Sequence, residues 1–398
     1  MKKEDLLIEL LCEELPPGVQ IPAVEALGKG LETALAAAGI PFETKRPFST
    51  PRRLAVLLTK VADKGEDASE TRRGPRVEAA FKEGQPTPAA LGFAKGAGVA
   101  LEKLGRVRTD QGEFLEARIE KKGKVLKEVI GEALPWILKN LPFPKVMRWG
   151  DSAGPFSRPL RGLILLHGKK VLPFSGMGVA SGNKALMGVA SGNRTRGPRV
   201  SGSKPLVLAS ASAYESILRR AGILADRGKR REALGRAFLK AGSSLKGGKL
   251  RPDEELLDTV TNDVENAFVL SGSFDEKYLE LPDEVVVTAM KEHQKYFAVQ
   301  DSGGKLLPAF VAATGLAKSG PAVVNGHERV LRARLEDARF YMNEDLKTTM
   351  GEKAARLDQV VFIRDWGTMK ERTERLGGLT KALGGNSVAQ DIASLCKA

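Results

Sequence analysis

The chain has 398 residues, of which 42% are hydrophobic and 28% are charged. This balance is typical of a globular protein rather than a disordered one, and the length is sufficient for two or three domains. Lys and Arg total 63 against 49 Asp and Glu, which gives a formal net charge of +14. Such an excess favours a polyanionic partner, because bound phosphates release condensed counterions.

Membrane, secreted and metal-binding proteins are excluded by what the sequence lacks. No apolar run approaches the roughly 18 residues that a membrane span needs. Glu9, Glu13 and Glu14 interrupt the apolar start of the chain, which argues against a secretory signal, so we predict a cytoplasmic protein. Cys12 and Cys396 lie at opposite ends of the chain, so we expect no zinc site and no disulfide framework, and we predict buried, unreactive thiols.

The first 62 residues predict a strand–helix–strand–strand order. Residues 5–11 form an apolar run that fits a buried strand or a short helix. In a run this short, the spacing of apolar residues does not distinguish a strand from a helix. A helix follows, with apolar residues at helical spacing from Val24 to Leu35 and Gly39 as a C-cap. Residues 42–47 and 54–61 are predicted strands that flank the run STPRR.

The next segment mixes loops with hairpins. Residues 64–88 are polar and punctuated by proline and glycine, which predicts a surface loop or partial disorder. We expect a hairpin around residues 110–112, a helix over 125–138 and a strand pair around Gly168. A Gly/Ser-rich loop over 176–205 contains MGVASGN twice, at 177–183 and at 187–193, which we interpret as a local duplication.

Helices dominate the remainder of the chain. Helical patterns cover parts of 213–244, residues 254–260 and a helix that starts at Pro282, and a hairpin over 296–313 follows. The longest helix is expected to begin near Glu328, with an apolar stripe at Leu331, Leu335, Ala338, Met342 and Leu346.

These elements predict a mixed, α+β fold with several α/β layers in the first two-thirds and helices after them. We predict three regions: an N-terminal α/β region over 1–200, a second α/β region over 201–325 and a helical region over 326–398.

Motifs for a self-contained catalytic centre are missing from the sequence. SGSK at 201–204 lacks the context of a phosphate-binding loop, and there is no GxSxG elbow and no paired-histidine motif. GHER at 326–329 has no Gly-rich strand before it and is a helix start rather than a synthetase motif. We therefore predict no catalytic and no metal-binding residues in this chain.

Several runs, in order, resemble one family. They are LLCEELPP at 10–17, FSTPRRLAV at 48–56, GPR at 74–76, PTPAALGFAKGAG at 86–98, KVMRWG at 145–150, FSRPLRG at 156–162, SGNRTRGPR at 191–199, LLDTVTNDVENAFVLSGSFDEKYLELP at 256–282, MKEHQKYFAVQD at 290–301, GKLLPAF at 304–310, GHERVLRARLEDARFYMNEDLK at 326–347 and FIRDWGTM at 362–369. Together they resemble the amino-terminal portion of the beta subunit of the bacterial, heterotetrameric glycyl-tRNA synthetase.

The resemblance implies a role without catalysis. In that family, two alpha and two beta subunits attach glycine to tRNA-Gly. The alpha subunit carries the class II catalytic domain and uses ATP with magnesium, and the beta subunit recognises tRNA and holds the assembly together. The resemblance also implies that 326–398 starts an incomplete HD-like helical domain and that the carboxy-terminal anticodon-binding domain is absent from this sequence.

The sequence departs from the family pattern at a few positions. The family usually has an aromatic residue at Gly162, a GHRF run around Pro198 and Val200, and asparagine at His327. The duplication within 177–193 is a further departure.

Basic residues of the resembling runs are the candidate tRNA contacts, because basic groups beside aromatic ones hold phosphates and stack bases. They are Arg52, Arg53, Arg148, Arg158, Arg161, Lys291, Lys295, Arg329 and Arg332.

Other interpretations stay open for the same residues. Tyr296 and Phe297, next to Lys295, fit a buried strand, and Arg332 lies within helical reach of Glu328 and Glu336. For the whole chain, the alternatives are a scaffold that only docks the alpha subunit, and a free-standing HD-type hydrolase. The missing His-Asp pair argues against the hydrolase.

Overall fold

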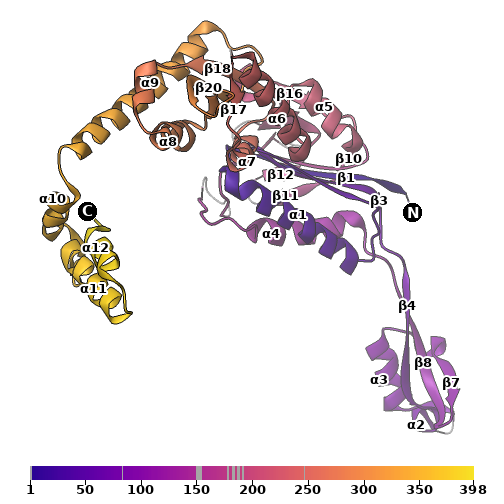
Figure 1. The fold of residues 1–398 in the computed structure, drawn as a ribbon. Helices are drawn as coiled ribbons and strands as arrows, with labels where there is room; N and C mark the ends of the chain where they lie inside the picture. The colour runs from indigo at the N-terminus through magenta and orange to yellow at the C-terminus, as the bar shows by residue number, and fades with distance from the viewer. Residues whose placement is uncertain are drawn as a thin grey trace. The chain divides into compact units, whose positions relative to one another are not determined.

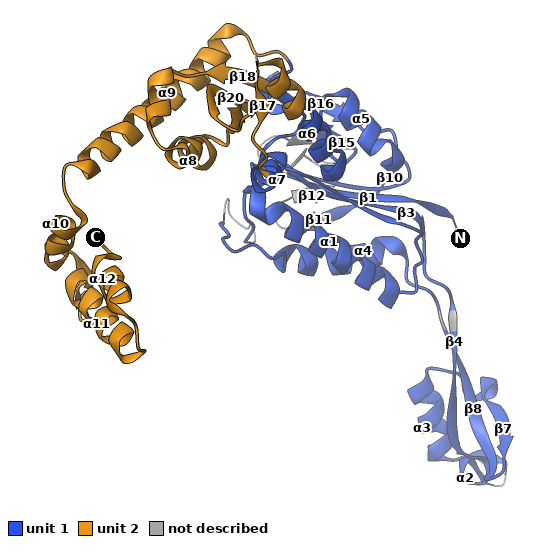
Figure 2. Ribbon diagram, viewed as in Figure 1, with its two compact units in different colours: residues 1–237, 254–268, 313–317 blue, residues 238–253, 269–312, 318–398 orange. Residues whose placement is uncertain are grey.

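The fold is taken from a computed structural model, which describes residues 2–82, 84–148, 155–176, 179–181, 184–185, 189–190, 192–245 and 247–398. The chain divides into two compact units (Figure 2). Unit 1 comprises residues 1–237, 254–268 and 313–317, and unit 2 comprises residues 238–253, 269–312 and 318–398. The mixed α and β content confirms the predicted fold class. The three regions predicted from the sequence stay a prediction.

A five-stranded antiparallel sheet forms the centre of unit 1, in the order β10-β9-β1-β3-β2. Its strands are β1 (Lys3–Cys12), β2 (Lys45–Thr50), β3 (Arg53–Ala62), β9 (Leu160–His167) and β10 (Lys170–Val171). Helices α1 (Pro17–Ala37) and α4 (Leu126–Lys139) pack side by side on one face (Figure 1).

Strand β1 is buried on both faces, which explains why its sequence is apolar without alternation. Leu6, Ile8 and Leu10 contact the cluster formed with α1 and α4. Leu7 lies on the opposite face, against a second cluster that includes α5 (Tyr214–Arg220). The run at 5–11 is therefore a strand, and the predicted alternative of a short helix is wrong.

Residues 68–121 form a separate small sheet with two helices. The sheet has the order β4-β8-β7, with β4 (Ala68–Arg76), β7 (Gly105–Thr109) and β8 (Gly112–Lys121), and it packs with α2 (Val77–Ala80) and α3 (Pro88–Ala97). The predicted loop over 64–88 is therefore wrong. Strand β4 contains no large apolar side chain and is held by backbone pairing with β8, so its sequence carries no alternation to detect.

The remaining elements of unit 1 lie partly beside the small sheet, within residues 81–103, and partly after β10 in the chain. They are β5 (Phe81–Lys82), β6 (Gln85–Pro86), η1 (Leu101–Lys103), β11 (Phe174–Gly176), β12 (Val179–Ser181), β13 (Lys184–Ala185), β14 (Val189–Ala190), β15 (Arg194–Arg196), η3 (Arg199–Ser201), β16 (Pro205–Val207), η4 (Ala211–Ala213) and α7 (Glu254–Asp263). The helix α6 (Arg227–Ser244) begins in unit 1 and ends in unit 2. The duplicated MGVASGN runs lie partly outside the described residues.

Unit 2 is built on a four-stranded sheet of order β17-β19-β20-β18. The strands are β17 (Lys249–Leu250), β18 (Phe268–Ser273), β19 (Phe297–Gln300) and β20 (Leu306–Thr314). Helices α8 (Asp283–Gln294) and α9 (Pro321–Leu346) pack with this sheet, and η5 (Glu276–Glu280) joins the same core. The last elements are α10 (Met350–Ala355), η6 (Arg356–Gln359), β21 (Val361–Ile363), β22 (Gly367–Thr368), α11 (Met369–Ala382) and α12 (Ser387–Leu395).

Two details of unit 2 correct the sequence predictions. Helix α9 begins at Pro321 rather than near Glu328, because proline suits the first turn of a helix. The predicted start was too late because Gly326, inside the helix, weakens the helical pattern of the sequence. Cys396 is exposed, whereas Cys12 of unit 1 is buried as predicted, and burial raises the pKa of the Cys12 thiol well above its usual range. Among the described residues, no helix is long and apolar enough to cross a membrane.

Candidate functional site

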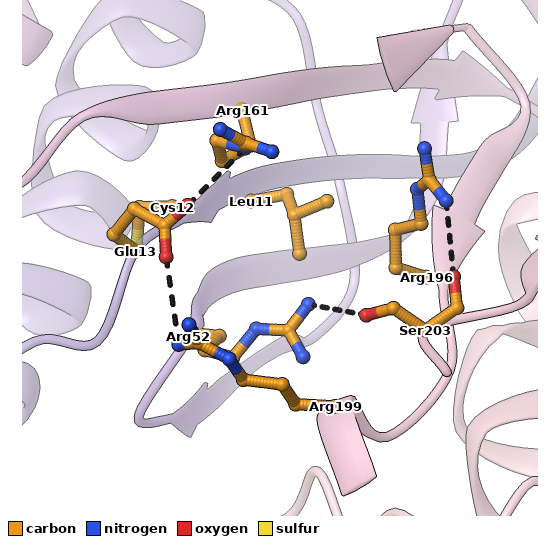
Figure 3. Close-up of a pocket in the computed structure, with 8 residues that line it drawn as sticks. All are labelled: Leu11, Cys12, Glu13, Arg52, Arg161, Arg196, Arg199 and Ser203. Atoms are coloured by element: carbon orange, nitrogen blue, oxygen red, sulfur yellow. Dashed lines mark hydrogen bonds and ion pairs between the residues drawn. The ribbon is translucent and has the colours of Figure 1, made fainter. Parts of the chain in front are cut away.

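Four arginines line one cavity in unit 1, which we call the arginine pocket. The cavity has a volume of about 250 Å³. Its lining residues come from the end of β1, the turn between β2 and β3, strand β9, and the segment from β15 to just beyond η3 (Figure 3). They are Leu11, Cys12, Glu13, Arg52, Arg161, Arg196, Arg199 and Ser203.

Backbone pairing brings these segments together. Arg52 follows Pro51 in the tight turn between β2 and β3, and the Arg52 carbonyl accepts the Cys12 N–H at 2.9 Å. Arg161 lies on β9, which pairs with β1 at the same end. Arg196 ends β15 and Arg199 begins η3. Three segments that are far apart in the sequence therefore each contribute arginines to one cavity.

Carboxylates hold Arg161 and Arg199 at the pocket. The Arg161 Nε lies 3.3 Å from Oε1 of Glu13. The Arg199 Nη1 lies 3.7 Å from Oε2 of Glu13 and 2.8 Å from Oε1 of Glu14. Glu13 is the acidic residue among the eight that line the pocket, so the lining carries more positive than negative charge.

Arg52 is the buried arginine of the pocket. Its residue surface is 8% exposed, and its Nη2 donates to the Ser203 Oγ at 3.0 Å. Its Nη1 is buried and has no hydrogen-bond partner, and the Glu265 Oε2 lies 4.0 Å from it. Burial lowers the pKa of Arg52; Glu265 opposes this shift, while the charges of Arg53 and Arg199 add to it. Arg52 thus donates to Ser203 at the arginine pocket, while its Nη1 faces Glu265, which lines a neighbouring cavity.

Arg53 and two carboxylates form a buried network close to the pocket. Arg53 is 0% exposed, pairs with Glu265, and its Nε lies 3.6 Å from Oε2 of Glu9. Burial opposes its charge, but Glu265 and Glu9 outweigh burial and raise the pKa of Arg53. Arg53 also donates to the Arg196 carbonyl, so it supports the strand that carries a pocket arginine. Because the Arg53 side chain has no exposed surface, we remove it from the predicted tRNA contacts.

Glu9 is held from the second face of the sheet. Its carboxylate accepts from the Thr195 Oγ1 and from the Tyr214 hydroxyl, each at 2.5 Å. Burial, followed by the charge of Glu9, raises the pKa of the Tyr214 hydroxyl well above its usual range, so tyrosine remains a donor. The network therefore joins β1, β3, β15 and α5.

The segments that form the pocket also match known proteins. The sequence pattern of the family described as glycyl-tRNA synthetase beta subunit matches residues 6–398. The chain belongs to this family. It is 39% identical over 404 residues to the glycine–tRNA ligase beta subunit of Desulfatibacillum aliphaticivorans, an alignment that covers 99% of this chain and 57% of the relative.

Further members of the glycyl-tRNA synthetase beta subunit family give the same result. The chain is 39% identical to the beta subunit of Myxococcus xanthus, covering 96% of this chain and 53% of the relative. It is 37% identical to the beta subunit of Psychromonas ingrahamii, in an alignment that covers 100% of this chain and 55% of the relative. The chain therefore spans about half the length of the curated relatives it matches.

The arginine pocket contains two of the predicted tRNA contacts and two residues that the prediction missed. Arg52 and Arg161 were predicted, and Arg196 and Arg199 were not. The run NRTRGPR at 193–199 has three arginines around a glycine and a proline, which was a sufficient signal to include them. Ser203 lies outside that run and carried no comparable signal.

Two other predicted contacts of unit 1 do not line the pocket. Arg158 is half-buried, and its Nη1 donates to the carbonyl of the neighbouring Ser157 at 2.9 Å. Arg148 is exposed. Trp149, which follows Arg148 in the run KVMRWG, lies outside the described residues. RNA contact by Arg148 and Arg158 stays a prediction.

The remaining predicted contacts belong to unit 2. Lys291 pairs with Asp253 at 2.9 Å, and Lys295 ends α8 in the left-handed conformation with φ 58°. Arg329 and Arg332 are exposed on α9.

The predicted partners of Arg332 are engaged by other residues. Glu328 accepts the Ser273 N–H at 2.9 Å. Glu336 accepts from Lys277 and from the Tyr278 hydroxyl, each at 2.7 Å. RNA contact by the four basic residues of unit 2 stays a prediction.

The aromatic pair of the MKEHQKYF run is part of the core of unit 2. Tyr296 is 4% exposed and Phe297 is 2% exposed. The Tyr296 ring stacks on Phe310 with centroids 4.5 Å apart, and its hydroxyl lies 2.6 Å from Nδ1 of His327. Burial raises the pKa of Tyr296 to about 12 and lowers that of His327. The interpretation of both aromatics as core residues is confirmed, so they do not stack on bases.

Proposed function

We propose that this chain is the tRNA-binding and assembly part of a glycine–tRNA ligase beta subunit. It works in the cytoplasm with a class II catalytic alpha subunit, which uses ATP with magnesium to attach glycine to tRNA-Gly. Two alpha and two beta subunits form the complete assembly. On this proposal the chain itself holds no cofactor and reads the phosphates and shape of the tRNA body.

The observation that carries the proposal is the arginine pocket. Three family segments place Arg52, Arg161, Arg196 and Arg199 around one cavity. Guanidinium groups match phosphate oxygens in geometry and stay charged at all physiological pH values. The formal net charge of +14 supports attraction of a polyanion to the whole chain.

Salt dependence of tRNA binding tests the proposal. Binding of labelled tRNA-Gly to the chain, with its alpha subunit present, is measured by fluorescence anisotropy at increasing KCl. Because each phosphate contact releases counterions, we expect the affinity to fall by roughly tenfold or more between 50 and 200 mM salt. Binding that does not change with salt, or no binding even with the alpha subunit, would contradict the proposal.

A second candidate function is a scaffold that only docks the alpha subunit. An apolar groove between α1 and α4, with a volume of about 460 Å³, favours it, because Trp136 lies at the groove and is 67% exposed. Capture of the alpha subunit by the immobilised chain without tRNA, together with salt-independent tRNA binding, would favour the scaffold. Failure to capture the alpha subunit would eliminate it.

A further inference from the structure

Four guanidinium groups converge on the arginine pocket, and one of them is buried. The Arg52 Nη2 donates to Ser203 of the pocket, while its Nη1 has no exposed surface and lies 4.0 Å from Glu265, which lines a neighbouring cavity. Arg52 therefore adds positive charge to the wall of the pocket. Arg161 and Arg199 supply the donors that an acceptor from solvent can reach.

We propose that the arginine pocket binds one phosphate group of an RNA, which accepts from Arg161 and Arg199 at its rim and lies close to the positive charge of Arg52. The proposal rests on the proposed function, because it takes tRNA as the polyanion. The Arg161 side chain is 30% exposed and that of Arg199 is 61% exposed, so both are reachable from solvent. Arg196 is fixed by its Nη1 bond to the Ser203 carbonyl at 3.1 Å and adds charge at one wall.

The charge of the pocket favours an anion. Four arginines and one glutamate line it. Burial first of all disfavours the charge of Arg52; Glu265 and Glu13 favour this charge, while Arg53 and Arg199 repel it. A bound phosphate relieves this repulsion, because it places negative charge between the guanidinium groups. A cavity of about 250 Å³ exceeds the ~30 Å³ share of one water molecule several-fold, so it has room for a phosphate group.

Glu13 occupies part of the position that the phosphate takes. Its two carboxylate oxygens lie 3.3 Å from Arg161 and 3.7 Å from Arg199, which are the two rim arginines. Glu13 therefore competes with the incoming anion and sets its affinity. Replacing Glu13 by glutamine removes the competing charge and keeps the side-chain shape, so this substitution is expected to strengthen phosphate binding. A purely structural role of these arginines predicts no such gain.

Four variants and one control test the site. Arg161→Gln and Arg199→Gln remove rim charges, and Glu13→Gln removes the competitor. Arg236→Gln is the matched control, because Arg236 is 67% exposed and pairs with Glu232, much as Arg199 is 61% exposed and pairs with Glu14. Circular dichroism melting confirms that each variant is folded. Arg52→Lys keeps the buried charge but loses the planar fork, and it shows whether the base of the pocket contributes.

The first readout is tRNA-Gly affinity as a function of salt, with the alpha subunit present. We expect Arg161→Gln and Arg199→Gln each to weaken binding by roughly tenfold and to reduce the salt slope by about one. We expect Glu13→Gln to tighten binding and Arg236→Gln to leave it unchanged. Wild-type affinity and slope in both rim variants would overturn the proposal while leaving the proposed function intact.

The second readout uses inorganic phosphate and does not depend on tRNA. Phosphate should raise the melting temperature of the wild type and of Glu13→Gln, but not of the two rim variants. If phosphate does not raise the melting temperature of the wild type, the proposed phosphate site is overturned, even if the chain binds tRNA. If phosphate binds the pocket but tRNA does not bind the chain, the proposed function fails and an RNA ligand is overturned.

The source of the phosphate is resolved by two further ligands. tRNA with and without its 5′-phosphate separates a terminal group from a backbone phosphodiester, and either result supports the site. The assignment of RNA as the ligand would be overturned by two results together. An acidic peptide would bind in a way that depends on Arg161 and Arg199, and tRNA binding would not depend on these two residues.

Discussion

Arg53→Met will lower the free energy of unfolding of the chain by about 3–5 kcal/mol, because it leaves the buried Glu9 and the partly buried Glu265 without the Arg53 charge. Arg53 is 0% exposed, and it pairs with Glu265 and approaches Glu9 at 3.6 Å. Glu9 is itself 1% exposed, so water does not replace the lost charge. Urea denaturation followed by circular dichroism measures the change.

Arg231→Met is the matched control for Arg53. Arg231 also bridges two carboxylates, Glu254 and Asp258, but its side chain is 34% exposed. Exposed pairs contribute about 0–1 kcal/mol, so the loss should stay in that range. Equal losses in the two variants would contradict the claim that burial gives Arg53 its structural role.

Phe310→Ala will destabilise unit 2 by about 3–5 kcal/mol, because it opens a cavity in the core. Phe310 is 0% exposed and stacks on Tyr296 with centroids 4.5 Å apart. Gly272 packs so closely on this ring that an added Cβ would lie 2.4 Å from its Cζ, which shows how tightly the site is filled. The loss is measured by denaturation monitored through hydrogen exchange of β20 amides.

Phe340→Ala is the control for the core position. Phe340 lies on α9 and is 58% exposed, so its removal should change stability by less than about 0.5 kcal/mol. A comparable loss in both variants would show that the ring of Phe310 is not part of a packed core.

Periodic apolar patterns were sufficient to predict most of the fold. Helix α1 and the hairpin of β19 and β20 lie where their patterns placed them, because one face of each is buried. Strand β4 was missed because it is an edge strand held by backbone bonds, which leave no trace in the pattern of side chains. The start of α9 was misplaced because Gly326 lowers the helical signal of its first turns.

The candidate site was predicted only in part, since burial and convergence are properties of the folded chain. Arg52 and Arg53 are adjacent and chemically identical in sequence, yet one lines the arginine pocket and the other is sealed beside Glu9. No local pattern distinguishes them. Arg161 and Arg199 share a cavity because β9 pairs with β1 and because the backbone leads through β15 to η3. Their spacing in the sequence does not indicate this.

Chemical footprinting of arginines tests most directly whether tRNA uses the arginine pocket. The chain, with its alpha subunit, is treated with an arginine-specific dicarbonyl reagent with and without tRNA-Gly, and modification is quantified by mass spectrometry. We predict that tRNA protects Arg161 and Arg199, while Arg236, which has a similar exposure to Arg199, is modified equally in both samples. Equal modification of Arg199 with and without saturating tRNA would contradict the account.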